Sequence, residues 1–83
     1  MSRYFFHVSD GSFQVDTEGV ELPGMTDARA EAIRTAGEIL RDCPENLWVS
    51  AEWQMHVTDE QRKTLLRLTF TVETATGVQG TFQ

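Results

Sequence analysis

Residues 3–16 decide the fold, and they read RYFFHVSDGSFQVD. Two runs of aromatic and β-branched residues flank the dipeptide Asp10-Gly11. Such runs favour strands, and Asp-Gly is typical of a tight turn whose central residues adopt positive φ angles. This stretch therefore predicts a β-hairpin with strands over residues 3–9 and 12–16.

The turn also predicts the register of this hairpin. A loop limited to Asp10-Gly11 places Val8 opposite Phe13 and Phe6 opposite Val15. Because side chains alternate between the two faces of a strand, these apolar residues then share one face. We expect that face to be buried and the other face of the hairpin to be open.

A helix follows the hairpin. Residues 20–24 read as an extended connector, because a residue that precedes proline is disfavoured in the helical region. The helix is expected to begin at Thr26 or Asp27, both good N-caps, and to end near Asp42, before a proline. At helical spacing one arc gathers its apolar residues, which are Ala28, Ala32, Ile33, Ala36, Ile39, Leu40 and Cys43.

A second hairpin is predicted from residues 48–58 and 64–72. Both runs alternate between apolar and polar residues, which is typical of half-buried strands. A loop centred on Glu60-Gln61 pairs Trp53 with Leu68 and Met55 with Leu66, so that apolar residues meet across the ladder. The other face of this hairpin reads as solvated.

The predicted fold class is α+β, with the order ββαββ. One four-stranded, largely antiparallel sheet carries a single helix packed on one face. We expect one domain over residues 1–74 and a loosely ordered C-terminal tail over residues 75–83. The residues expected to pack under the helix are Tyr4, Phe6, Val8, Phe13, Val15, Trp53, Met55, Leu66, Leu68 and Phe70.

Composition narrows the possible partners. The 83 residues include 7 basic and 13 acidic ones, a formal net charge of −6, which argues against direct binding of nucleic acid. The sequence shows neither a secretory signal pattern nor an apolar run long enough to cross a membrane. The single Cys43 cannot form an intramolecular disulfide, which fits a reducing compartment. We therefore expect a cytoplasmic protein without a membrane partner.

Three segments carry a resemblance to a known family. They are residues 3–11 (RYFFHVSDG), 16–23 (DTEGVELP) and 28–32 (ARAEA). They resemble a family of short bacterial proteins, common in alphaproteobacteria, that is classed as a domain of unknown function. The resemblance covers about the first 43 residues well, supports the fold and implies no activity. In the second hairpin it implies a loop glycine, which residues 59–63 lack.

A weaker resemblance links the chain to the antitoxin component of HicAB-type toxin–antitoxin pairs. These proteins also place an early hairpin, a segment like Leu22-Pro23-Gly24 and an alanine-rich helix in that order. This chain lacks the DNA-binding segment that many of them carry at the C-terminus. The likeness is at the level of the fold, which by itself says little about function.

No catalytic, cofactor-binding or metal-binding residues are expected. His7 and His56, with Asp16 or Glu52, are of the types that ligate zinc, but they lack a short ligand spacing and read as solvated surface residues. The sequence contains neither a nucleophile elbow nor a glycine-rich phosphate loop. We therefore predict a protein that is not an enzyme and has no cofactor.

Arg29 is the one residue that fits its predicted position poorly. It lies inside the apolar arc near the positive end of the helix dipole, where a cation is disfavoured. We expect a structural ion pair with Glu18 or Glu21, and the alternative is an anion-binding site.

The open sheet face is the candidate interaction surface. Large apolar side chains on an exposed face are typical of self-association or partner binding. The function favoured by the sequence is a protein-binding or regulatory module, with a homodimer as the expected assembly. The alternative is an antitoxin-like or inhibitor-like acidic protein that blocks a basic site on its partner. The expected surface consists of Phe5, His7, Trp48, His56, Leu65 and Arg67.

Overall fold

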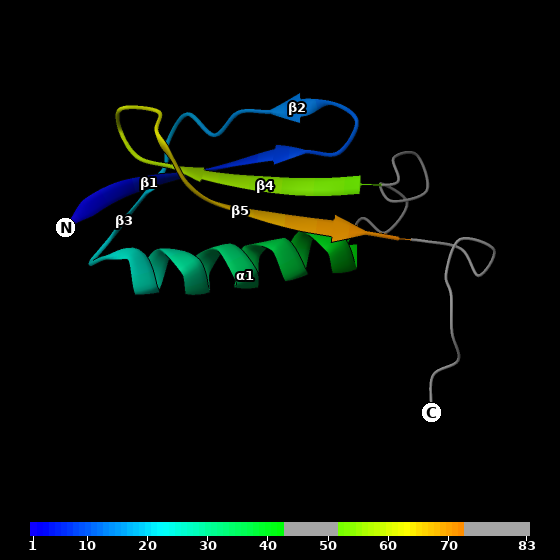
Figure 1. Ribbon diagram of the computed structural model, residues 1–83. Helices are drawn as coiled ribbons and strands as arrows, with labels where there is room; N and C mark the ends of the chain where they lie inside the picture. The colour runs from blue at the N-terminus through cyan, green and yellow to red at the C-terminus, as the bar shows by residue number, and fades with distance from the viewer. Residues whose placement is uncertain (43–51, 73–83) are drawn as a thin grey trace.

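The computed structural model describes residues 1–42 and 52–72 (Figure 1). Within these residues the chain forms one helix and several strands, all paired antiparallel. In chain order they are β1 (Ser2–Ser9), β2 (Phe13–Gln14), β3 (Val20–Leu22), α1 (Met25–Asp42), β4 (Glu52–Thr58) and β5 (Thr64–Thr71).

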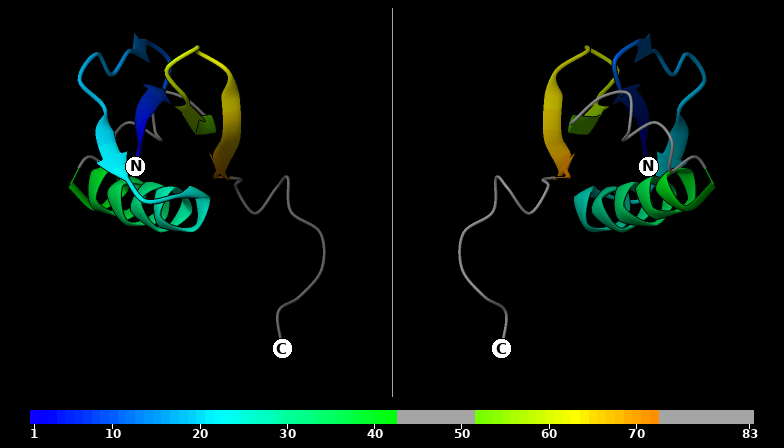
Figure 2. Two further views of the ribbon diagram at one scale, coloured as in Figure 1. Left: turned by 90° about the vertical axis from the view of Figure 1, so that its left-hand side faces the viewer. Right: turned by 90° about the vertical axis from the view of Figure 1, so that its right-hand side faces the viewer.

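The α+β fold predicted from the sequence is confirmed. The sheet has the strand order β2-β1-β4-β5, and β3 pairs with β1 as a fifth strand. Figure 1 shows α1 running beneath one face of the sheet, and Figure 2 shows β2 and β3 on the same side of β1. The opposite face of the sheet is the open face. Within the described residues, no helix is long and apolar enough to cross a membrane.

The register predicted for the first hairpin is wrong by one residue. Ser9 pairs with Phe13 and Val8 with Gln14, so the loop contains Asp10, Gly11 and Ser12. The Asp10 side chain caps this loop by accepting a hydrogen bond from the Ser12 backbone N–H. A shift of one residue moves every side chain to the other face. Phe13 and Val15, expected in the core, are consequently exposed.

The connector before the helix contains a strand that the sequence analysis did not predict. Residues Val20–Leu22 pair with the start of β1, with Tyr4 opposite Val20 and Ser2 opposite Leu22. The expectation of extended backbone here was correct, but the pairing was missed. Because β1 is already paired along its other edge, β3 and β2 together cover the edge that would otherwise be open.

The second hairpin is also shifted, but by two residues. Trp53 pairs with Phe70 and Met55 with Leu68, and a bulge lies between Val57 and Thr58. Because the shift is even, the apolar residues that were predicted to pair across β4 and β5 keep their predicted face. Leu65, expected on the open face, is partly buried and packs against the core.

The core lies between α1 and strands β1 and β4. Trp53, Met55 and Val57 are almost fully buried, at 1%, 0% and 0% exposure. They pack with Tyr4, Val8 and the buried alanines of α1, which are Ala28, Ala32 and Ala36. The buried face of the helix is narrower than predicted, because Ile33 is exposed. Phe70 on the outer strand β5, also expected in the core, is exposed as well.

The helix begins one residue earlier than expected, at Met25, where the Gly24 carbonyl accepts a hydrogen bond from Ala28 N–H at 3.0 Å. Several predictions concern residues outside the described ranges. They are the buried Cys43, the exposed Trp48, the domain boundary at residue 74 and the tail over residues 75–83.

Candidate functional site: a hollow on the open sheet face

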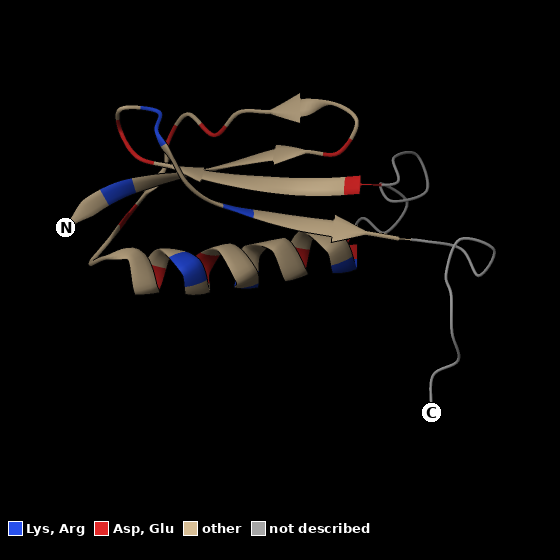
Figure 3. Cartoon of the chain, viewed as in Figure 1, with Lys and Arg blue, Asp and Glu red and all other residues tan. Residues whose placement is uncertain are grey.

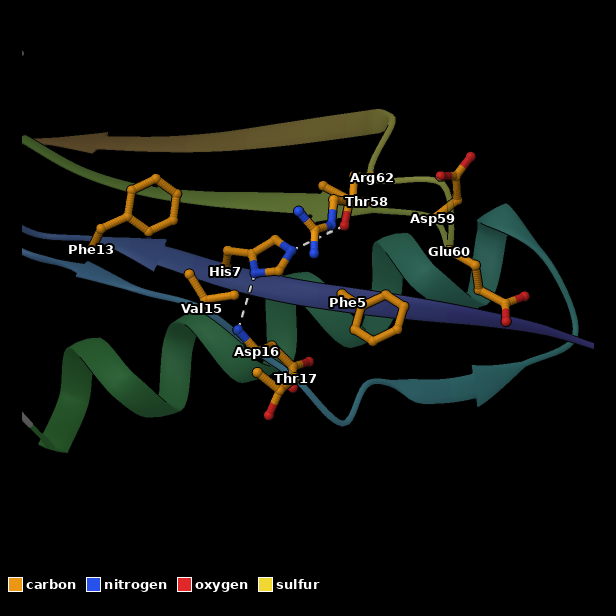
Figure 4. Close-up of a pocket in the computed structure, with 10 residues that line it drawn as sticks. All are labelled: Phe5, His7, Phe13, Val15, Asp16, Thr17, Thr58, Asp59, Glu60 and Arg62. Atoms are coloured by element: carbon orange, nitrogen blue, oxygen red, sulfur yellow. Dashed lines mark hydrogen bonds between the residues drawn. The ribbon is translucent and has the colours of Figure 1, made fainter.

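The open face carries a hollow of about 560 Å³ near the turn between β4 and β5 (Figure 4). Strand β1 contributes Phe5 and His7, and the segment after the first loop contributes residues 13 and 15–17. The end of β4 and the loop that follows contribute Thr58, Asp59, Glu60 and Arg62. The first hairpin and the distant loop after β4 therefore form the hollow together.

Its apolar part consists of Phe5, Phe13 and Val15. Phe13 is 65% exposed and Val15 is 64% exposed. The Phe5 ring stacks with the His7 ring, with centroids 6.4 Å apart and planes 6° apart. The Phe13 ring lies 6.5 Å from that of His56 on β4. These aromatic contacts are of the offset or tilted kind that aromatic rings prefer, and they fix the ring positions.

Asp16 holds the segment that carries Phe13 and Val15 against β1. Its Oδ2 accepts a hydrogen bond from Phe6 N–H at 3.1 Å, and its Oδ1 accepts from Glu18 N–H and Gly19 N–H at 3.0 and 3.1 Å. Between β2 and β3 the Asp16 side chain thus takes the place of a backbone carbonyl as the acceptor for Phe6 N–H. Gly19 permits this geometry, because its φ is 72° and a Cβ there would lie 2.9 Å from the Tyr4 carbonyl oxygen.

These contacts also affect the Asp16 carboxyl group. Partial burial raises its pKa, but the backbone N–H groups of Gly19, Phe6 and Glu18 and the nearby His7 favour the carboxylate more strongly. The net result is an Asp16 pKa below its ordinary value. The carboxylate therefore has a structural role in positioning the hollow.

His7 is fixed in one tautomer by its neighbours. Its Nδ1 accepts a hydrogen bond from Asp16 N–H at 3.0 Å, so that nitrogen carries no proton. The proton of the neutral ring is therefore on Nε2, which donates to Thr58 Oγ1 at 3.0 Å (Figure 4). The sequence analysis expected a solvated histidine, whereas His7 is partly buried and uses both ring nitrogens to join β4 to residue 16.

The loop over residues 59–63 is similarly organised by a carboxylate. Asp59 Oδ1 accepts hydrogen bonds from Gln61 N–H and Lys63 N–H at 2.8 and 2.9 Å. Arg62 adopts a left-handed backbone conformation with φ 65°. A glycine adopts this conformation without steric strain, whereas a residue with a Cβ adopts it less readily.

Two other predicted surface residues, His56 and Arg67, lie beside each other on β4 and β5. His56 Nε2 is hydrogen-bonded to Gln54 Oε1. His7 and His56 are also partners across β1 and β4. In the part of the chain that the structure describes, no cluster of three or more His, Cys, Asp or Glu residues is arranged to hold a metal ion.

The ion pair predicted for Arg29 is wrong. Glu21 pairs with Arg3 at 2.9 Å, and the Glu18 carbonyl accepts a hydrogen bond from the same arginine at 2.7 Å. Arg29 is exposed and forms no ion pair within residues 1–42 and 52–72. Since the register of β1 and β3 was not predicted, the sequence analysis did not identify Arg3 as the partner.

Sequence reasoning missed Phe13, Val15 and Arg62 as members of the site. The wrong register placed the first two in the core. The available signal for a longer loop was Ser12 after Asp10-Gly11, because its N–H and hydroxyl can both donate to the Asp10 side chain. For Arg62 the signal was the loop without a glycine.

A family model with the description "Domain of unknown function (DUF6894)" matches residues 3–71. The chain belongs to the DUF6894 family. The match extends well past the first 43 residues and includes β4 and β5, so the whole hollow lies within the DUF6894 domain. No curated protein and no solved structure matches this DUF6894 chain.

Proposed function

We propose that this DUF6894 domain is a non-catalytic protein-binding module whose partner docks in the hollow on the open sheet face. The observation that carries this proposal is the exposure of Phe13 and Val15 side by side at the hollow. Burial of apolar surface contributes about 25 cal/mol per Å², so two such side chains favour association. Apolar patches held on an ordered surface are typical of interaction sites.

The rigidity of the hollow supports the proposal. Asp16 fixes the segment behind Val15, and Asp59 fixes the loop that carries Arg62. His7 links these two sides through its hydrogen bonds to Asp16 N–H and Thr58 Oγ1. A surface that is already ordered loses less conformational entropy when a partner binds.

The same contacts favour binding over catalysis. A general base needs a free lone pair within reach of a substrate proton. The Nδ1 lone pair of His7 is occupied by a backbone N–H, and the Asp16 oxygens accept from three others. These groups position the backbone of the hollow.

The inhibitor-like alternative receives less support. It requires an acidic surface free to occupy a basic site. On α1, Glu31 and Glu38 both pair with Arg34, at 2.6 and 3.0 Å, so these two carboxylates already share one cationic partner. The hollow on the open face combines the apolar side chains of Phe5, Phe13 and Val15 with acidic residues, and two of those acidic residues, Asp16 and Asp59, accept hydrogen bonds from backbone N–H groups.

Site-specific photocross-linking tests the proposal. The photoreactive residue p-benzoylphenylalanine replaces Phe13 in one variant and Ile33 in a matched control, which is 58% exposed on α1. We expect position 13 to give a defined cross-linked species in the cells that produce the protein, and position 33 to give none. Equal cross-linking at both positions, or none at position 13, would contradict the proposal.

The cross-linked species also tests the expected homodimer. A product with twice the mass of the chain identifies a second copy as the partner, and a larger or smaller addition identifies another protein. Light scattering on a size-exclusion peak gives an independent answer, because a strict monomer at high concentration excludes the homodimer.

A further inference from the structure

The proposed function leaves the chemistry of the partner open, and the charges around the hollow constrain it. Resting on that function, we propose that the hollow binds a polypeptide segment in which an aromatic or aliphatic side chain lies next to a carboxylate. The apolar side chain occupies the space between Phe5, Phe13 and Val15, and Arg62 binds the carboxylate.

Three carboxylates line the hollow, and two of them already accept hydrogen bonds from backbone N–H groups. Asp16 accepts hydrogen bonds from three backbone N–H groups, and Asp59 Oδ1 accepts from two. Backbone dipoles directed at a carboxylate reduce the field that it exerts on a neighbouring site. Figure 4 shows the Glu60 side chain pointing away from the rings of Phe5 and His7.

Arg62 is the cation at the hollow that has no carboxylate partner within the described residues. Arg3, Arg34 and Arg41 each form an ion pair with an acidic residue, whereas Arg62, like Arg29, Lys63 and Arg67, forms none within the described residues, and of these four only Arg62 lines the hollow. In Figure 4 its guanidinium extends from the loop toward His7 and Thr58, over the hollow. A guanidinium presents a planar set of donors that matches a carboxylate in two parallel hydrogen bonds.

The backbone at Arg62 is a second, independent observation. With φ at 65°, this position is one where a side chain is sterically unfavourable and glycine is not. Residues held in such conformations concentrate at ligand-binding positions, where their geometry serves the site.

The dimensions of the hollow agree with this ligand. Its volume of about 560 Å³ lies within the range of roughly 300–1,000 Å³ found for binding pockets. The side chains of Phe5, Phe13 and Val15 supply an apolar wall, and the guanidinium lies at its rim. An apolar group and an adjacent anion can therefore be bound at the same time.

Titration of the ¹⁵N-labelled protein with three matched peptides tests the proposal. The probes are acetyl-Asp-Phe-Asp-amide, its neutral isostere acetyl-Asn-Phe-Asn-amide and the cationic acetyl-Lys-Phe-Lys-amide. We expect the acidic peptide to shift the amide signals of residues 5–7, 13–17 and 58–62 and to bind roughly threefold to tenfold more tightly than the neutral one, because partly exposed ion pairs contribute modestly. The cationic peptide should bind most weakly.

Two variants assign the preference to Arg62. Arg62→Asn removes the guanidinium, and asparagine tolerates positive φ well, so its denaturant midpoint should be unchanged or higher. This variant should bind the acidic and neutral peptides equally. Lys63→Asn is the matched control, because Lys63 is an exposed neighbouring cation that does not line the hollow, and it should keep the wild-type preference.

Each other outcome overturns the proposal in a distinguishable way. Equal affinity for all three peptides, lost when Phe13→Ser is introduced, removes the role of Arg62 but leaves apolar docking and the proposed function intact. A preference for the cationic peptide, or no binding of any peptide, contradicts the inferred partner, and the cross-linking at position 13 then decides the proposed function separately. Tighter binding of an eight-nucleotide oligothymidylate than of the acidic peptide would assign the hollow to nucleic acid.

Discussion

The two faces of the sheet carry similar side chains in very different surroundings. On the covered face, Trp53, Met55 and Val57 are almost fully buried against α1. On the open face, Phe13 and Val15 are about two-thirds exposed, at 65% and 64%. Figure 3 shows that α1, which covers the first face, alternates basic and acidic residues along its length.

This difference separates residues that stabilise the fold from residues free for another role. Burial on the covered face removes apolar surface from water within the chain, so it contributes to folding. The exposed pair on the open face contributes little to folding and retains its apolar surface for a partner. The open face is ordered by polar contacts of Asp16, His7 and Asp59.

Truncation on the covered face should give the largest loss of stability. Met55→Ala removes a fully buried side chain, and buried Met→Ala changes typically cost about 2–5 kcal/mol. Phe13→Ala is the matched change on the open face, and it should alter the free energy of unfolding by less than about 0.5 kcal/mol. Urea unfolding measures both. Comparable losses for the two variants would show that Phe13 belongs to the core.

A smaller loss is expected from Asp16→Asn. An amide nitrogen cannot accept the hydrogen bond from Phe6 N–H, so one backbone donor loses its partner. We expect a loss of about 1–2 kcal/mol, since Asp16 is only partly buried and solvent screens its charge. Asp10→Asn is the control, because the carbonyl oxygen of asparagine can still cap the first loop. If the two variants unfold at the same urea concentration, the role assigned to Asp16 is wrong.

The pH dependence of stability should report the same carboxylate. The pKa of Asp16 in the folded protein lies below its ordinary value of 3.8, so the unfolded chain takes up its proton first as the pH falls. The stabilisation is therefore present in full above the unfolded pKa and is lost as the pH falls through the folded pKa. Urea midpoints measured from neutral to acidic pH should decline less steeply for Asp16→Asn than for the wild type. Parallel declines would contradict this assignment.

The sequence predicted the architecture well because its helix and its second hairpin each carry a clear periodic pattern of apolar residues. The helix over residues 25–42 has a clear apolar stripe, and both strands of the second hairpin alternate. The second register was wrong by two residues, but an even shift preserves the faces, so the apolar residues predicted to pair across it stayed on one face. The first was wrong by one, and that single residue moved Phe13 and Val15 out of the core.

The site was less predictable because it depends on contacts between distant segments. Phe5, His7 and His56 were correctly placed on the open face. Asp16 was placed at the end of the second strand and read as a solvated surface residue, and its link to Phe6 could not be derived until β2 and β3 were known to pair with β1 at different registers. Arg62 could not be assigned because the sequence does not report its backbone angle.

The additional residue in the first loop places Phe13 on the open face. Nuclear Overhauser effects from the Phe13 ring test this most directly. We predict contacts with the His56 ring, whose centroid lies 6.5 Å away, and none with the buried alanine methyl groups of α1. Contacts between the Phe13 ring and those methyl groups, without any to His56, would place Phe13 in the core and contradict the account.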